Sequence, residues 1–100
     1  QLLASGVSFD AVFVQSDEMA IGVMRAALDA GLSIPKDVSV MGFDGIALGK
    51  YLNPTLSSVS QPIEEIGIQA AKLLLSLLEG RDVPPLTLLA HTIQEGESVG

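Results

Sequence analysis

The sequence contains no cysteine among its 100 residues. This absence excludes a disulfide framework, a thiolate nucleophile and a cysteine-based metal site. Positive charge is also scarce, because five Lys and Arg face twelve Asp and Glu, which gives a formal net charge of −7. A surface this acidic repels phosphate backbones and anionic membranes, so these residues are not themselves a nucleic-acid clamp or a membrane-binding patch.

Long apolar runs are missing too. A membrane-spanning helix requires roughly 18 apolar residues, whereas the run Leu73–Leu75 ends at Ser76. The first residues lack the positive segment that opens a secretory signal peptide. We therefore expect a cytoplasmic protein. Because the chain begins with Gln rather than Met, we also expect it to begin within a longer protein.

What is abundant is apolar character without aromatic rings. Hydrophobic residues make up 48% of the chain, charged residues 17% and aromatics 4%, whereas ordinary domains carry about 25% charged residues. A chain of this length buries only roughly 60–70% of its unfolded surface. The excess predicts a protein that oligomerises, or a piece of a larger one.

The order of patterns predicts an α/β fold with a parallel, doubly wound sheet. An apolar run without alternation at 11–14 indicates a strand buried on both faces. Helical periodicity follows it, and a second apolar run comes next, as in a βαβ unit. The predicted strands are 11–14, 38–43, 57–60 and 86–94, and the predicted helices are 18–30 and 63–78.

The first helix is too apolar to pack against a single surface. Its polar or very small residues fall in one narrow stripe, and an apolar belt covers the rest. We expect the sheet on one side of this helix and another surface on the other. The second helix has one apolar face, which should pack on strands that this chain does not contain. That face comprises Ile63, Ile66, Ala70, Leu73, Leu74 and Leu77.

Polar residues follow two of the predicted strands. Ser16 and Asp17 come after the first, and Asp44 ends the second. Ligands of open parallel sheets bind beyond the carboxyl ends of the strands, and a carboxylate there can accept hydrogen bonds from sugar hydroxyls. Two alternatives stay open, in which Asp17 is the N-cap of the helix and Asp44 is an ordinary turn residue.

Signals for an enzyme, a metal site or a cofactor are weak. His91 is the only histidine, and it lies on the last predicted strand, so a structural or solvent-facing role is favoured. Residues 42–45 lack the glycine spacing and the Lys-Ser/Thr pair of a phosphate loop. Glu64 and Glu65 are adjacent on a helix and point in different directions. We predict a protein that is not an enzyme and that has no metal ion or cofactor.

Three segments together resemble the lactose-repressor (LacI) family of bacterial transcription regulators. Residues 16–22 resemble its Asn-Asp-x-x-Ala-x-Gly motif, and residues 34–44 its Val-Pro-x-Asp-Val-Ser-Val-Val-Gly-Phe-Asp motif. Residues 54–62 resemble its Pro-x-Leu-Thr-Thr-Val-x-Gln-Pro motif. The three occur in the family's order and spacing, and the resemblance covers about residues 9–99.

The resemblance implies a fragment of a two-lobed core of the periplasmic-binding-protein-like (type I) fold. Residues 1–60 would belong to the C-terminal lobe, and Gln61 and Pro62 would lie at a hinge. Residues 61–85 would belong to the N-terminal lobe, and residues 86–100 would return as the final strand. A helix-turn-helix DNA-binding domain would lie upstream and is absent here.

Site residues also follow from the resemblance. The effector-contacting Asn of the family falls on Ser16, the Asp of its Gly-Phe-Asp motif on Asp44, and the position after Gln-Pro on Ile63. Three positions depart from the family pattern. Ser16 replaces Asn, Gly45 replaces a frequent second Asp, and Gly96 stands where an Arg is common.

The family's dimer interface gives the apolar belt of the first helix a partner. The interface residues carried over are Ile21, Met24, Arg25, Leu28, Tyr51 and Leu52. Packing within the chain's own core is the alternative for Leu28 and Ile21. The resemblance thus implies the effector-binding and dimerisation region of a homodimeric repressor, which binds a small molecule of sugar type and reaches operator DNA only through the missing domain. A periplasmic sugar-binding protein of the same fold is the alternative, and it requires no dimer surface.

Overall fold

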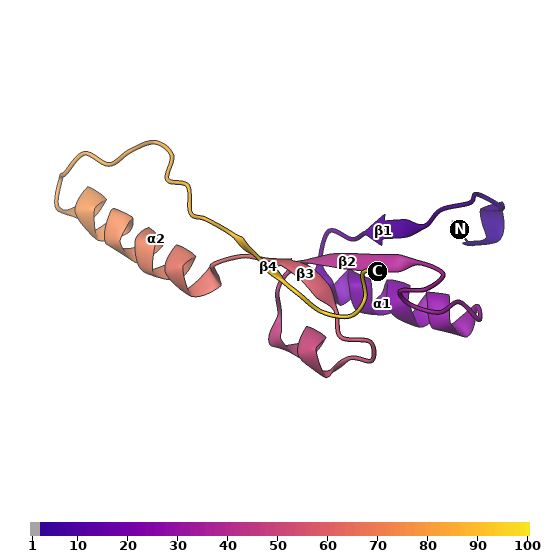
Figure 1. Ribbon diagram of the computed structural model, residues 1–100. Coiled ribbons are helices and arrows are strands. Elements are labelled where there is room, and N and C mark those ends of the chain that lie inside the picture. The colour runs from indigo at the N-terminus through magenta and orange to yellow at the C-terminus, as the bar shows by residue number, and fades with distance from the viewer. Residues whose placement is uncertain (1–2) are drawn as a thin grey trace. The chain divides into compact units, whose positions relative to one another are not determined.

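The computed structural model describes residues 3–100 (Figure 1). These residues form two compact units. Unit 1 contains the residues up to Ser60 and Ile93–Gly100, and unit 2 contains Gln61–Thr92. The elements in chain order are η1 (Leu3–Ser5), β1 (Ala11–Phe13), α1 (Asp17–Asp29), β2 (Ser39–Asp44), η2 (Ala47–Tyr51), β3 (Ser57–Ser60), α2 (Ile63–Leu78) and β4 (Thr92–Gln94).

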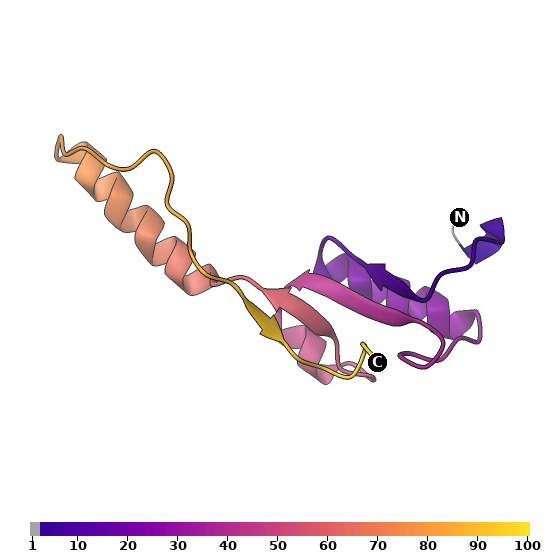
Figure 2. The ribbon, with the colours of Figure 1, turned by 45° about the horizontal axis from the view of Figure 1, so that its top comes forward.

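The strands form one sheet in the order β1-β2-β3-β4. β1 pairs with β2 in parallel, with Val12 opposite Val40, and β2 pairs with β3 in parallel, with Gly42 opposite Ser58. Figure 2 shows β1, β2 and β3 side by side, with α1 against one face. The parallel α/β prediction is confirmed, and the strands at 38–43 and 57–60 are found within one residue of their expected bounds.

α1 begins where capping and dipole favour a helix start. The Ser16 side chain accepts a hydrogen bond from the Met19 backbone N–H at 3.2 Å, as an N-cap does. Asp17 and Glu18 then lie in the first turn, where negative charge is stabilised. The buried positions recur every three or four residues and comprise Asp17, Ala20, Met24 and Ala27. That spacing turns a single face of α1 towards β2.

The core of unit 1 lies between this face of α1 and the sheet. Val40 on β2 and Leu56 before β3 are almost completely buried there, together with Ala20 and Met24. The opposite face of the sheet is more open, because Phe13 of β1 is 60% exposed, although its ring packs edge-to-face with that of Phe43 at 6.5 Å between centroids. The prediction that the first strand is buried on both faces is therefore wrong for this chain.

The last residues of the chain fasten β2 to β3. Ser98 is fully buried, and its hydroxyl donates to the Val40 carbonyl at 2.5 Å while accepting from the Ser57 N–H at 2.8 Å. The Val40 N–H donates to the Ser98 carbonyl at 2.9 Å. Gly96 passes so close to the chain before β3 that a Cβ would lie 2.7 Å from backbone atoms of Thr55 and Leu56. No side chain fits at Gly96 in this backbone.

Unit 2 consists of α2 and an irregular segment. The predicted helix 63–78 is confirmed at both ends. Among the described residues, α2 buries no side chain, and its apolar residues, including Ile63, Ile66, Leu74 and Leu77, are exposed. The predicted strand 86–94 is shorter than expected, because only Thr92–Gln94 forms β4. Residues 86–91 belong to unit 2, where the described residues offer no strand for pairing. No described helix is long and apolar enough to span a bilayer.

Replacing Ser98 with Ala should lower the free energy of unfolding by about 2 kcal/mol, because the Val40 carbonyl and the Ser57 N–H then lose a buried partner. Urea titration of the full-length protein measures the change. Ser33→Ala is the control, since Ser33 is exposed and should change stability by less than about 0.5 kcal/mol. Equal stability of the two variants would contradict the assigned role of Ser98.

Candidate functional site

The carboxyl ends of three parallel strands meet at one edge of the sheet. β1 ends at Phe13, β2 at Asp44 and β3 at Ser60, and their parallel pairing brings these ends to the same side. Ser16 lies between the end of β1 and the start of α1, where it is half-buried. Ligands of open α/β sheets bind at such an edge. The structure therefore brings Ser16 and Asp44, two predicted ligand residues, to one edge of unit 1.

Asp17 lies at the same edge but is completely buried. Its Oδ2 accepts hydrogen bonds from the backbone N–H groups of Gly45 and Ile46, each at 2.8 Å. Its Oδ1 accepts from the hydroxyl of the fully buried Ser58 at 2.7 Å. The alternative of Asp17 as helix N-cap is wrong, because Ser16 is the cap and Asp17 is the first residue of α1. Both carboxylate oxygens are used within the chain.

Two glycines near Asp17 leave no room for a side chain. A Cβ at Gly42 would overlap Oδ1 of Asp17, so the strand must lack a side chain at this point. Gly45 has a positive φ of 77°, and a Cβ there would lie 2.8 Å from the Cα of Ser60. No side chain fits at Gly45 in this backbone. A glycine inside a strand signals a close approach of this kind, and the sequence reasoning missed this signal.

Asp44 adopts a backbone conformation that is costly for any residue except glycine. Its φ is 124°, and its side chain is half-buried. Non-glycine residues in such regions cost about 1–3 kcal/mol and concentrate at ligand sites. The adjacent N–H groups of Gly45 and Ile46 are fixed by Asp17, so the turn has a stable anchor despite the strain.

The side chains at this edge suit a ligand that carries hydroxyl groups. A serine hydroxyl both donates and accepts, and a carboxylate accepts two or more hydrogen bonds. Among residues 3–100, no group of three or more His, Asp or Glu side chains gathers in a way that could hold a metal ion. His91 is exposed and belongs to unit 2, whereas Ser16 and Asp44 belong to unit 1.

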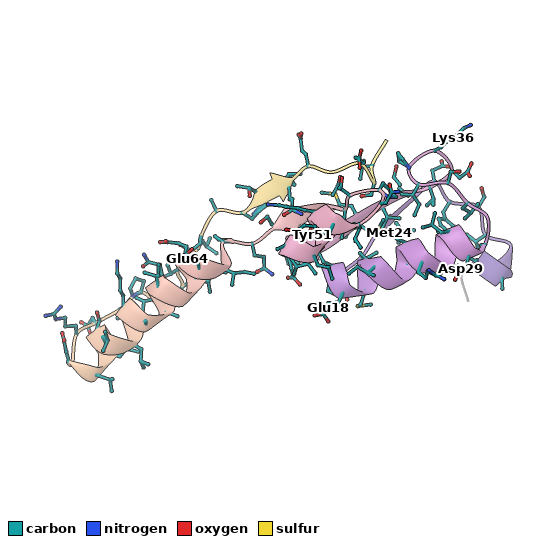
Figure 3. The ribbon with its side chains drawn as sticks, turned by 90° about the horizontal axis from the view of Figure 1, so that it is seen from below. Glu18, Met24, Asp29, Lys36, Tyr51 and Glu64 are labelled. Atoms are coloured by element: carbon teal, nitrogen blue, oxygen red, sulfur yellow. The ribbon has the colours of Figure 1, made fainter. Side chains whose placement is uncertain are left out.

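Five of the six predicted interface residues line one shallow hollow of about 160 Å³ on unit 1. Met24 forms its floor and is only 4% exposed, because it also belongs to the core. Figure 3 shows Met24 on the side of α1 turned to the strands, with Glu18 turned away. The lining comprises Ile21, Met24, Arg25, Leu28, Leu52 and Asn53.

Tyr51 does not line this hollow, whereas Asn53 does. Tyr51, the sixth predicted residue, ends η2 and is 83% exposed. Asn53 was missed by the sequence reasoning, because a polar residue in a turn carries no interface signal. Arg25 pairs with Asp29 one turn along α1 at 3.1 Å, and both side chains are exposed. An exposed pair of this kind adds little stability, so Arg25 can change partner at small cost.

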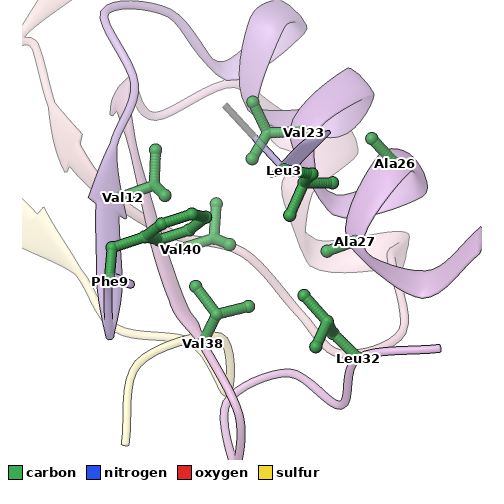
Figure 4. A pocket seen from close by; sticks show the side chains of 9 residues that line it. All are labelled: Leu3, Phe9, Val12, Val23, Ala26, Ala27, Leu32, Val38 and Val40. Carbon is green, nitrogen blue, oxygen red and sulfur yellow. The ribbon is translucent and has the colours of Figure 1, made fainter. Parts of the chain in front are cut away.

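A second hollow, of about 240 Å³, lies between α1, β1 and β2 (Figure 4). The residues that line it are all apolar, including Phe9, Val23, Leu32 and Val38. With no polar side chain to orient hydroxyl groups, this hollow is unsuited to a sugar.

The remaining predicted residues belong to unit 2. Gln61 and Pro62 precede α2, and the Pro62 carbonyl accepts the Ile66 N–H at 2.8 Å, so Pro62 stands at the N-cap position. Ile63 is the first residue of α2 and is 61% exposed. The ligand role of Ile63 and the hinge role of Gln61 and Pro62 stay predictions.

Comparison with known proteins agrees with this architecture. The family profile described as "Periplasmic binding protein-like domain" matches residues 3–99. The probable HTH-type transcriptional repressor ExuR of Bacillus subtilis is 43% identical over 82 residues, which is 82% of this chain and 25% of that protein. The LacI-family regulator of Arthrobacter sp. FB24 in complex with lactose superposes with a TM-score of 0.88 at 35% identity, over 99% of this chain and 38% of that one. The chain belongs to the LacI family.

The LacI family also contains the lac repressor, whose dimer has been solved bound to operator and the anti-inducer ONPF. This chain superposes on that structure with a TM-score of 0.94 at 30% identity, over 99% of its own length and 35% of the repressor chain. The chain thus spans between 25% and 38% of these three LacI-family proteins. The fold prediction is confirmed, and these relatives carry the names of transcription regulators rather than enzymes.

The strain at Asp44 yields a stability prediction. Asp44→Gly should be more stable than Asp44→Ala by about 1 kcal/mol, because glycine adopts the positive φ without steric cost. Thermal unfolding of the two full-length variants measures the difference. Leu48→Gly against Leu48→Ala is the control pair at an exposed position of η2, and there glycine should be the less stable variant. A result for Asp44 with the same sign as the control would contradict the strain.

Proposed function

We propose that this chain is the effector-binding and dimerisation region of a LacI-type transcription regulator. The observation that carries the proposal is the strained, half-buried Asp44 at the carboxyl edge of the parallel sheet, beside a turn that Asp17 anchors. Strain of this kind is retained where a ligand is bound. The chain's membership of the family supports the same reading.

The effector is a small polyhydroxylated molecule of sugar type. Its hydroxyl groups donate to the Asp44 carboxylate and exchange hydrogen bonds with the Ser16 hydroxyl, which already accepts from the Met19 N–H. The Arthrobacter relative, whose structure was solved in complex with lactose, supports this class of ligand. Ile63 is the apolar contact that the family motif implies, while Asp17 acts from behind the site because its oxygens are engaged.

The dimer surface is the hollow on α1 together with η2 and Leu52. Ile21 and Leu28 supply exposed or half-exposed apolar area, and Arg25 supplies a charge whose present partner is weakly held. An exposed apolar patch rimmed by polar groups is typical of an interaction site. The dimeric lac repressor supports a second copy of this chain as the partner.

Control of DNA binding follows from the two surfaces. The effector stabilises one of two lobe arrangements, and the dimer transmits the change to paired DNA-binding domains upstream. In this proposal unit 1 belongs to the C-terminal lobe and unit 2 to the N-terminal lobe, with the hinge at Gln61 and Pro62. The net charge of −7 fits a cytoplasmic region that leaves DNA contact to another domain.

Asp44→Ala in the full-length protein should weaken effector binding about 100-fold, because two hydrogen bonds to a charged group are lost. A panel of mono- and disaccharides that includes lactose is first screened against the wild-type protein by thermal shift. Calorimetry with the strongest sugar then compares the variants. Binding to an operator selected from random DNA should be unchanged. Equal sugar affinity of the variant and the wild type would contradict the role of Asp44.

Ile21→Asp should raise the dimer dissociation constant by about 100-fold or more, because an unpaired carboxylate is expensive to bury at an interface. Sedimentation equilibrium measures the dissociation constant, and circular dichroism verifies that the variant is folded. Ile21→Leu conserves apolar volume and should stay dimeric. A dimer that persists in Ile21→Asp would locate the interface elsewhere.

A further inference from the structure

We propose that Asp17 is the positioning residue that couples the effector edge to the dimer surface. Its buried carboxylate fixes the turn after Asp44 and, through that turn, the segment that leads to Leu52. The inference rests on the proposed function, because it gives a physical link between the two surfaces named there. Each step of the link is a contact within unit 1.

The first step is the pair of hydrogen bonds by which Asp17 holds the turn after β2. The two N–H groups that donate to Oδ2 come from Gly45 and Ile46, which directly follow Asp44. Both distances are 2.8 Å, and hydrogen bonds to a charged acceptor are among the strongest in proteins. The peptide unit that follows Asp44 is therefore held from outside its own strand. The orientation of the Asp44 side chain depends on a residue 27 positions earlier in the chain.

The second step is that the atoms packed around the Asp17 carboxylate prevent it from moving. Ser58 donates to Oδ1 at 2.7 Å, and its own hydroxyl oxygen accepts from the Gly45 N–H at 3.1 Å. Gly42 closes the other side, because a Cβ there would overlap Oδ1. Burial of a charge is costly unless donors surround it, and here the donors belong to the turn and to β3. A movement of the turn therefore exposes the charge to an unfavourable environment.

The third step leads from the turn to the dimer surface. Ile46 is the N-cap of η2, and its carbonyl accepts from the Gly49 N–H at 3.2 Å. The Gly49 carbonyl accepts from the Leu56 N–H at 2.9 Å, which ties η2 to the core. η2 ends at Tyr51, and the next residue, Leu52, lines the hollow. The wall of the hollow that contains Leu52 is therefore separated from the anchored turn at Gly45 and Ile46 only by η2.

The opposite wall of the hollow belongs to the helix that Asp17 begins. α1 carries Ile21 and Leu28, one and three turns after the carboxylate. Because the same side chain anchors α1 to the turn that leads to η2, a ligand that pulls on Asp44 shifts one wall relative to the other. The coupling needs no contact between effector and partner subunit.

The test compares Asp17→Asn with Glu18→Gln in the full-length protein. Asn keeps one carbonyl oxygen, so it can satisfy either the two N–H groups or Ser58 but loses the charge that holds them all. Glu18 is exposed in the same turn of α1, and its variant loses the same charge without touching the turn at 44–46. If Asp17→Asn does not fold, Ser58→Ala removes a single donor and replaces it in every measurement.

Hydrogen exchange read by mass spectrometry is the first measurement, made well below the melting temperature. The peptide that covers residues 44–52 should exchange about tenfold faster in Asp17→Asn than in the wild type and in Glu18→Gln. Equal exchange in all three proteins overturns the inference, whatever the sugar measurements give.

Affinity for the sugar that the wild type selects from the lactose-containing panel is the second measurement. Asp17→Asn should bind it about tenfold more weakly, and Glu18→Gln should bind it equally well. A folded Asp17→Asn with faster exchange and unchanged affinity makes Asp17 a structural support only and overturns the positioning role. A wild type that binds no sugar contradicts the sugar effector of the proposed function, and the exchange measurement then decides the inference alone.

Discussion

The carboxylate of Asp17 joins three segments that are far apart in the sequence. Asp17 is the first residue of α1. Its carboxylate accepts hydrogen bonds from two backbone N–H groups of the turn after β2 and from one hydroxyl of β3. A buried charge tolerates few alternatives, because each missing donor costs about 1–3 kcal/mol. Gly42 has no room for a side chain because the Asp17 carboxylate fills the space beside it, and Gly45 has none because Ser60 does. The Asp of one motif and the glycines of another are therefore parts of a single construction.

Strain and stability are divided between neighbouring residues at this edge. Asp44 stands at a φ of 124°, while the residues directly after it are held by strong hydrogen bonds. The anchor is buried and the strained residue is only half-buried, so a ligand contacts Asp44 directly and acts on Asp17 only through the turn between them. Such a division allows a site to respond to a ligand while the surrounding fold stays intact.

Much of this architecture could be predicted from local patterns. Helical periodicity located α1 and α2, and the apolar run that ends in Asp44 located β2, because these signals come from neighbouring residues. The role of Asp17 could not be predicted in this way, since Ser16 was an equally good cap and Ser58 lies 41 residues later. The length of β4 was misjudged for a similar reason, because a strand requires a neighbour as well as a propensity. The family resemblance named Ile21 and its neighbours as a dimer interface, which stays a prediction, whereas Asn53 was added to the lining of the hollow only by the fold.

The hydrogen bond from Ser98 to the Val40 carbonyl has a consequence for the order in which the sheet is completed during synthesis. The two residues are 58 positions apart, and the whole of unit 2 is translated between them. β1, α1, β2 and β3 therefore leave the ribosome well before the segment that completes their sheet. During that interval the edge of β3 lacks its final strand, and unpaired strand edges are prone to aggregation. A nascent chain that ends before Ser98 would therefore lack the hydrogen bonds by which this residue joins Val40 to Ser57.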